Sequence, residues 1–545
     1  VPEGEPTFLP AGQVPIMLEL RLPIQQTYAP YFPAMYGRTE KNGKIKEKGR
    51  RPGAWQYHWA ILHDFAIQPI PTADVWITPR LVEVPSPMDE HAKVMRFGNQ
   101  NNGASPYADR ILKVSLRSVK RWMDSALGEK GWPSGNSDHD EVLEFLYPMA
   151  HHTRNALGMD IVKGTGLEWA LLMAMIDNES VWQNDRGSAR AWMPGGFGVV
   201  PDELKPALAG YVHKIPVETL SLGHTPIYAF VSQAWDTPAK NPADVIPLAI
   251  HDQKMGGFAL RSGYADGSFL AIFDAARQPL RNATRAGEFT LFGLGQTWAG
   301  RATYGGGTAY FLKLGHANTV TIDGLYPLGG GKVIHADLRK DGSGSVSFDL
   351  SACYAGAKPA EVSGEPGTTG ATAGFGIRWD KQGPVPSNVK AIRAMAVDYS
   401  GKSGAKALLV VADKFDGAKD LLKTWRMNAG DKVVADPKVN MPAKAGRVDI
   451  PASALTLKSK DGRLSMRVTF VAPQKPIVWL DSFGLAGRAS VSRVNASTQG
   501  DGFFAIMTVQ EGEPPAVKVE GAGLDAKITI GGQTVRFDGS RVVIE

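Results

Sequence analysis

Cysteine is almost absent from this sequence, which has a single one, Cys353, in 545 residues. A disulfide framework within the chain and a cysteine-based metal site are therefore excluded. Cys353 lies in a stretch that we predict to be a strand, where we expect a small buried side chain rather than a reactive thiol. No apolar run is long enough to span a bilayer, so we expect no membrane partner.

The sequence has fewer acidic residues, 54 Asp and Glu, than basic ones, 60 Lys and Arg, and the formal net charge is +6 at pH 7. A mild basic excess attracts polyanions over long distances. Residues 38–51 concentrate this charge in Arg38, Lys41, Lys44, Lys46, Lys48, Arg50 and Arg51. Such a run is usually a solvated loop, and no nucleic-acid-binding module surrounds it. The expected partner is therefore an anionic polysaccharide, with no nucleic acid.

The pattern of apolar residues changes near residue 250. Before it, helical spacing covers residues 108–127, 141–157 and 167–176, and shorter helices are expected at 201–210 and 242–251. The third of these is apolar almost all round, so we expect it to be buried. We predict an α+β multidomain protein with a helical region over residues 1–250.

After residue 250, short strands alternate with turns rich in Gly, Asp and Asn, which indicates an antiparallel sandwich. The clearest predicted strands are 258–261, 269–273, 319–322, 346–350, 407–411, 464–470 and 542–544. Hairpin turns are expected at Lys458–Gly462 and Ile530–Gln533. We assign residues 251–435 to the sandwich and 436–545 to a C-terminal β-sheet region, which either completes the sandwich or forms a small separate sheet.

Several short motifs occur in a particular order between residues 95 and 430. They are Gly131-Trp-Pro133 leading to Glu144-Phe-Leu-Tyr-Pro148, then Met255-Gly-Gly-Phe-Ala-Leu-Arg-Ser-Gly263 with Gly267-Ser-Phe-Leu-Ala-Ile-Phe273, Gly287-Glu-Phe-Thr-Leu-Phe-Gly-Leu-Gly-Gln-Thr-Trp298, Gly315-His-Ala-Asn-Thr-Val-Thr-Ile-Asp-Gly324, and Leu408-Leu-Val-Val-Ala-Asp413 followed by Trp425. In order and spacing they resemble the heparinase II/III-like polysaccharide lyases.

The resemblance implies an (α/α) toroid-type helical region packed on a large antiparallel β-sandwich, with a substrate cleft between them. It also implies cleavage of uronic-acid-containing polysaccharides by β-elimination, in the periplasm or outside the cell. The helical part of this chain is shorter than that fold leads us to expect.

β-Elimination needs a group that neutralises the uronate carboxylate, a base for the C5 proton and an acid for the leaving oxygen. The resemblance points to Asn99 and Asn101 in an Asn-rich turn for the first role, although Asn also favours turns and helix N-caps. The nearest proton-transfer groups are His139 and Tyr147. His titrates near neutral pH, whereas core packing is the alternative for Tyr147.

The metal-binding pattern of the family is altered. Where relatives carry His-x-His-x-Asp-x-Gly-Ser-Phe, this chain has Arg281-Asn-Ala-Thr-Arg-Ala-Gly-Glu-Phe289. Ala283 and Arg285 take the ligand positions, and guanidinium has no lone pair for a metal, so we expect no metal and no other cofactor.

Two interpretations of this change remain. Arg281, Asn282 and Arg285 replace the metal as direct anion contacts, or Arg285 pairs structurally with Glu288 and catalysis is lost or has moved elsewhere. In the first case His316 is a candidate base, and its alternative is a core histidine.

Two aromatic groups complete the predicted substrate-binding set. Tyr304 opens a glycine-rich turn beside the altered site, and Trp55 belongs to an aromatic cluster next to the basic run. Aromatic faces can stack on sugar rings, but buried clusters are commoner. The leading hypothesis is a polysaccharide lyase. The alternatives are a non-catalytic relative that binds anionic carbohydrate, and a glycoside hydrolase, which needs two carboxylates such as Asp138, Asp140, Glu141 or Glu144.

Overall fold

The chain divides into two compact units, residues 1–124 with 368–375 and residues 125–367 with 376–545. The structure, a computed structural model, describes residues 7–9, 75–77, parts of 116–182, then 196–212, 237–276, 286–300, most of 317–359 and most of 388–545. In the first unit, β1 (Thr7–Leu9) and β2 (Val75–Ile77) pair antiparallel. The second unit contains the larger sheets described below.

Two antiparallel sheets form the sandwich. The eight-stranded sheet has the order β10 (Lys332–Leu338), β11 (Gly344–Asp349), β13 (Lys390–Asp398), β14 (Ala407–Asp416), β22 (Gly502–Glu511), β19 (Leu464–Ala472), β18 (Ala454–Ser459) and β16 (Val433–Ala435). The seven-stranded sheet has the order β12 (Lys358–Pro359), β9 (Leu325–Tyr326), β8 (Val320–Ile322), β15 (Lys423–Ala429), β21 (Val491–Thr498), β20 (Ile477–Phe483) and β17 (Arg447–Ile450). Strands before and after residue 435 therefore pair directly in both sheets.

A five-stranded meander precedes the sandwich strands. It contains β3 (Ala249–Asp252), β4 (Gly257–Arg261), β5 (Leu270–Asp274), β6 (Glu288–Gly293) and β7 (Gln296–Ala299), in sequence order. Strands β4, β5 and β6 are buried at every position, so the sheet is covered on both faces. This explains why their sequences are continuous apolar runs rather than alternating ones.

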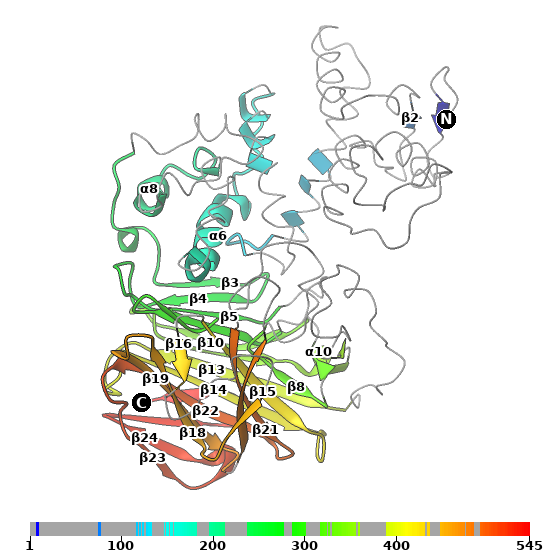
Figure 1. Cartoon of the computed structure of the whole chain (residues 1–545). Coiled ribbons are helices and arrows are strands. Elements are labelled where there is room, and N and C mark those ends of the chain that lie inside the picture. Colours follow the sequence, from blue (N-terminus) through cyan, green and yellow to red (C-terminus); the bar gives the residue numbers. More distant parts are fainter. Residues whose placement is uncertain are drawn as a thin grey trace, which may run out of the picture. The chain divides into compact units, whose positions relative to one another are not determined.

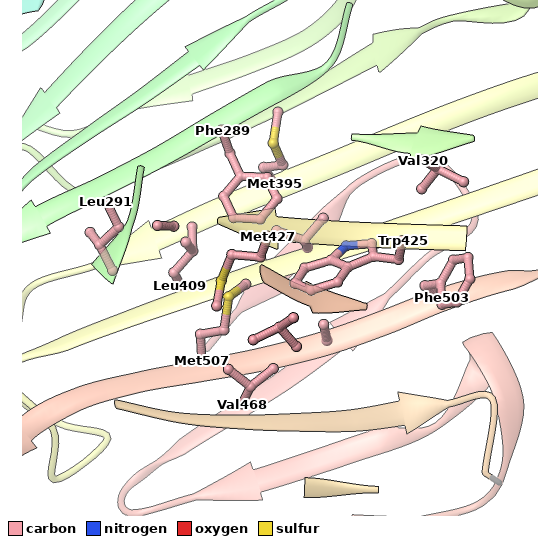
Figure 2. Close-up of a cluster of buried hydrophobic side chains, with 14 of the residues drawn as sticks. Phe289, Leu291, Val320, Met395, Leu409, Trp425, Met427, Val468, Phe503 and Met507 are labelled. Atoms are coloured by element: carbon pink, nitrogen blue, oxygen red, sulfur yellow. The ribbon is translucent and has the colours of Figure 1, made fainter. Parts of the chain in front are cut away.

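The main core joins the meander to the sandwich. Figure 2 shows Phe289 of β6 beside Trp425 and Met427 of β15 and Met395 of β13. The Trp425 ring lies 5.8 Å from Phe289 and meets Phe470 edge to face at 5.3 Å, measured between centroids. Edge-to-face and tilted contacts are favourable for aromatic rings.

The last residues form a third layer. Strands β23 (Val517–Glu520), β24 (Lys527–Ile530), β25 (Gln533–Phe537) and β26 (Val542–Ile544) make a four-stranded sheet. Its inward side chains, such as Ile528 and Val535, form a second core with Leu408, Val410 and Ile506 of the eight-stranded sheet. The C-terminal region thus both completes the sandwich, through β17 to β22, and adds a separate small sheet.

The predicted strands and hairpin turns agree with the structure, including β26, which begins and ends as expected. The expected buried helix is α6 (Leu167–Trp182), where Leu171, Leu172 and Met175 have no exposed surface. The second unit also contains α8 (Lys205–Val212) and further helical turns within residues 146–157 (Figure 1). These described helices do not by themselves define a toroid, and no described helix is long and apolar enough to cross a membrane.

Two predictions of local structure are wrong. Residues 242–251 form a short 3-10 turn, η3 (Pro242–Asp244), and then strand β3 rather than a helix. The backbone N–H and C=O groups of β3 form their hydrogen bonds with β4 and not within a helix. Cys353 lies not in a strand but in α10 (Ser351–Ala355), because the Asp349 carboxylate accepts the N–H of Ser351 at 2.9 Å and starts a turn. It is buried as expected, and this burial raises the pKa of Cys353 to about 12.

Candidate functional site

Among the predicted site residues, Tyr147 lies within the part of the chain that the structure describes. The remaining predicted residues lie outside it: Trp55, Asn99, Asn101, His139, Arg281, Asn282, Arg285, Tyr304 and His316. Their roles stay predictions. The described residues that flank them show how their segments are anchored.

Tyr147 belongs to the helical turns after residue 145, between the buried side chains of Leu146 and Ala150. Its ring lies so close to Gly196 that a Cβ there would come within 2.5 Å of its Cε2 atom. Tyr147 has no exposed surface, and its hydroxyl has no hydrogen-bond partner among the described residues. Burial raises the pKa of Tyr147 above its usual 10.0. The phenol therefore stays neutral near pH 7, as an ordinary tyrosine does, and burial makes it hold its proton more firmly.

The Asp252 carboxylate joins the helical part of the unit to the meander. Its Oδ2 accepts the N–H groups of Lys130 at 2.8 Å and Trp132 at 3.2 Å, and its Oδ1 accepts that of Met255 at 2.9 Å. Gly131, between the two donors, has φ 72°, and a Cβ there would lie 2.5 Å from the Cα of Ala170. Only glycine fits this turn. The backbone is therefore held in place as far as Trp132, seven residues before His139.

A cation lies at the same turn. The Lys130 ammonium is 4.4 Å from the centroid of the Trp169 ring in α6, and both side chains are half-buried. No described carboxylate forms an ion pair with Lys130. Lys254, in the β3–β4 turn, donates to the carbonyl of Leu127 at 2.7 Å. An ammonium over an aromatic face is attracted by the electrons of the ring, so Trp169 holds the Lys130 ammonium at this turn.

A buried polar node links all three sheets of the sandwich and meander. Arg393 of β13 forms a bidentate salt bridge with Asp413 of β14, in which Nε donates to Oδ1 at 2.6 Å and Nη2 donates to Oδ2 at 3.0 Å. Its Nη1 also donates to the carbonyls of Gly287 at 2.7 Å and Asn318 at 2.9 Å. Burial raises the pKa of Asp413, while the Arg393 guanidinium opposes that effect. The bidentate geometry satisfies both charges within the core.

Asn318 extends this node. Its amide donates to the carbonyls of Phe289 at 2.6 Å and Gly300 at 3.1 Å, and its Oδ1 accepts the N–H of Asn428 at 2.7 Å. The neighbouring Thr319 hydroxyl donates to the carbonyl of Ala286 at 3.2 Å. A buried hydrogen-bond network of this kind favours one arrangement of the backbone.

The node therefore holds the ends of two predicted substrate-binding segments. Residues 277–285, with Arg281, Asn282 and Arg285, end at Ala286. Residues 301–316, with Tyr304 and His316, follow Gly300, and only Ala317 separates them from Asn318. Ala286, Gly287 and Gly300 lie where β6 begins and β7 ends. Hydrogen bonds from Thr319, Arg393 and Asn318 to their carbonyls hold these two strand ends together.

Sequence reasoning missed Lys130, Trp169, Asp252 and Asn318. Lys130 directly precedes the Gly131-Trp-Pro133 motif, and Asn318 lies inside the motif that ends at Gly324, so both were within reach. Asp252 carried no local signal, because its partners lie about 120 residues earlier. In the described part of the chain, no three His, Cys, Asp or Glu side chains gather closely enough to hold a metal.

Comparison with known proteins gives structural likeness alone. No protein-family model matches the sequence, and no curated protein does. A mutant of the heparan sulfate lyase HepC from Pedobacter heparinus matches 95% of this chain and 77% of its own, with 10% identity and a TM-score of 0.50. A second HepC structure from that organism has 11% identity over 86% and 70% of the two chains, with a TM-score of 0.48, and a heparinase III structure has 9% over 86% and 69%, with 0.42. The chain thus has a distant polysaccharide-lyase-like fold.

Proposed function

We propose that this chain is a polysaccharide lyase that cleaves an acidic, uronic-acid-containing polysaccharide by β-elimination. The observation that carries the proposal is the likeness to a heparan sulfate lyase over 95% of the chain. The ordered motifs between residues 95 and 430 and the net charge of +6 support it independently. Fold likeness alone does not establish an activity, and the ultraviolet absorbance of the product tests this one.

The proposed reaction needs no oxidant and no added water. A base removes the C5 proton, the electron pair forms the C4–C5 double bond, and the C4–O bond breaks as an acid protonates the leaving oxygen. We assign carboxylate neutralisation to Asn99 or Asn101 and proton removal to His139, with His316 as the alternative base. Tyr147 is the candidate acid.

Substrate contacts in the proposal come from cations and aromatic side chains. Arg281, Asn282 and Arg285 take the place of the metal site, and Trp55 and Tyr304 offer aromatic faces. We add Lys130, whose ammonium lies against Trp169 without an acidic partner among the described residues. An (α/α) toroid over residues 1–250, packed on the sandwich, remains the proposed architecture. The proposed location is the periplasm or the outside of the cell.

Ultraviolet absorbance of the conjugated uronate double bond tests the reaction directly. The protein is mixed with a panel of uronic-acid polysaccharides, with and without a chelator. We expect rising absorbance on at least one acidic polymer and none on a neutral one. The rate should not change with chelator, because Arg285 cannot bind a metal. His139→Ala, purified in parallel, controls for contaminating lyases.

A second candidate, non-catalytic binding of anionic carbohydrate, is favoured by Ala283 and Arg285 at the family's ligand positions. Flat absorbance across the panel, with binding retained, would support this candidate. Flat absorbance with new reducing ends would instead indicate a hydrolase.

A further inference from the structure

Lys423, the first residue of β15, is a charged side chain inside the protein. It is only 1% exposed, and no ion pair among the described residues involves it. Its ammonium instead donates to three backbone carbonyls, those of Ala418 at 2.7 Å, Leu421 at 3.0 Å and Gln499 at 3.3 Å. An ammonium has three N–H donors, so every donor is used.

The three carbonyls come from connections that cross between the two sandwich sheets. Ala418 and Leu421 lie between β14 and β15, and Gln499 lies between β21 and β22. The Gln499 amide also donates to the carbonyl of Asp420 at 3.2 Å. The ammonium therefore joins both crossovers at one end of the sandwich.

A third turn joins the same end. Asp323, after β8, accepts the N–H of Leu422 on Oδ1 at 2.8 Å and donates its own N–H to the Leu422 carbonyl at 2.8 Å. Burial lowers the pKa of Lys423, whereas the charges of Asp501, Asp323 and Asp420 oppose that effect. The three carboxylates thus offset part of the cost of burying the ammonium.

The dimensions indicate which cation fits. Backbone carbonyls can replace the hydration shell of a monovalent cation, as in potassium channels. Calcium prefers oxygen ligands at about 2.3–2.6 Å, shorter than the 2.7–3.3 Å found around the Lys423 ammonium. The ring of carbonyls suits a singly charged ion about the size of ammonium.

We propose that these carbonyls form a monovalent-cation site that the chain fills with its own Lys423 ammonium. When the side chain is shortened, a free ammonium, alkylammonium or potassium ion takes the vacated place. The native protein therefore closes this end of the sandwich without a dissolved cation. The proposal is independent of the lyase activity.

Chemical rescue of Lys423→Ala tests the site. In buffer with tetramethylammonium as the only cation, we expect its melting temperature to fall by about 5–10 °C, because three buried carbonyls lose their donor. Exchange of that salt for butylammonium at constant ionic strength should restore most of the loss, and potassium or ammonium should restore part of it. Wild type and Lys406→Ala, which lacks only a half-exposed ion pair with Glu511, should show no such difference.

Lys423→Met is the second variant, since it keeps an apolar stem in place and lacks the charge. It should be destabilised and should not respond to butylammonium. Equal effects of butylammonium and tetramethylammonium on Lys423→Ala, or a Lys423→Met protein as stable as wild type, would overturn the proposal. If Lys423→Ala is insoluble, refolding with each cation decides. Recovery with butylammonium alone supports the site, and equal failure with both contradicts it.

Discussion

Buried tyrosines of this protein differ in whether their hydroxyl groups have hydrogen-bond partners among the described residues. Tyr354 donates its hydroxyl to the carbonyl of Val320 at 2.9 Å. Tyr147 is equally buried, yet its hydroxyl has no partner among the described residues. A buried hydroxyl without a partner is costly and needs an explanation. A part in proton transfer is one explanation that a single variant can test.

Tyr147→Phe should leave the free energy of unfolding within about 0.5 kcal/mol of wild type, because no described hydrogen bond is lost. If Tyr147 is the acid, turnover should fall by about 10²- to 10⁴-fold. Denaturant unfolding and the ultraviolet assay measure the two effects. Tyr354→Phe is the matched control, which should lose about 1 kcal/mol of stability and keep full turnover. Unchanged turnover in Tyr147→Phe would assign Tyr147 to packing alone.

Arg393 and Asp413 show how much one buried pair can matter. Arg393→Met should destabilise the protein by about 3–5 kcal/mol, because Asp413 is left charged in the core and two carbonyls lose a donor. Lys406→Ala breaks a half-exposed pair with Glu511 and should cost less than about 1 kcal/mol. Urea unfolding compares the two. A small loss in Arg393→Met would show that the node is not a main source of stability.

Strands and turns are the next scale, and here the last sheet offers a pH test. Asp538 follows β25, and its Oδ1 accepts the N–H groups of Ser540 at 3.0 Å and Arg541 at 2.8 Å. Burial alone would raise the pKa of Asp538, but the bonds from Arg541 and Ser540 outweigh it and lower the pKa below the usual 3.8. The folded state therefore binds this proton less readily than the unfolded chain does.

The sign of the pH effect follows from this lowered pKa. The stabilisation from ionised Asp538 is complete above about pH 4 and disappears as the pH falls through the lowered value. Asp538→Asn should thus melt below wild type at pH 7, with a difference that shrinks toward pH 2. Asp525→Asn, which removes an exposed carboxylate of the same C-terminal region, should show little difference at either pH. A gap for Asp538→Asn that stays constant with pH would contradict the assignment.

At the scale of the whole molecule, the proposed function requires that cations such as Arg285 and Lys130 bind an acidic substrate. Arg285→Ala and Lys130→Ala should each weaken binding of acidic oligosaccharides several-fold at low salt, and less at high salt because charges are screened. Neutral oligosaccharides should bind equally to all variants. Calorimetric titration measures both, with Lys406→Ala as the control for a general loss of charge. Unchanged binding in Arg285→Ala would reject the replacement of the metal by arginine.

Local patterns in the sequence were sufficient for most strands and turns. The β18–β19 and β24–β25 hairpins were predicted because Gly462, and Gly531 with Gly532, lie between runs that suit strands. Cys353 and residues 242–251 were misassigned because side-chain caps and strand pairing overrode their apolar pattern. The candidate site was predicted mainly from motifs, and Tyr147 is its one member among the described residues.

The sequence by itself determined the buried helix α6 and most of the described antiparallel strands after residue 256, because helical and strand periodicity are local properties. Tertiary structure alone decided that β14 pairs with β22, from Ala407 opposite Val509 onward. It also decided that Arg393, Asp413 and Lys423 lie inside with their charges satisfied. These outcomes depend on residues far apart in the chain. A buried charge is stable only when it is hydrogen-bonded, and a local sequence pattern does not show which distant groups will supply those bonds.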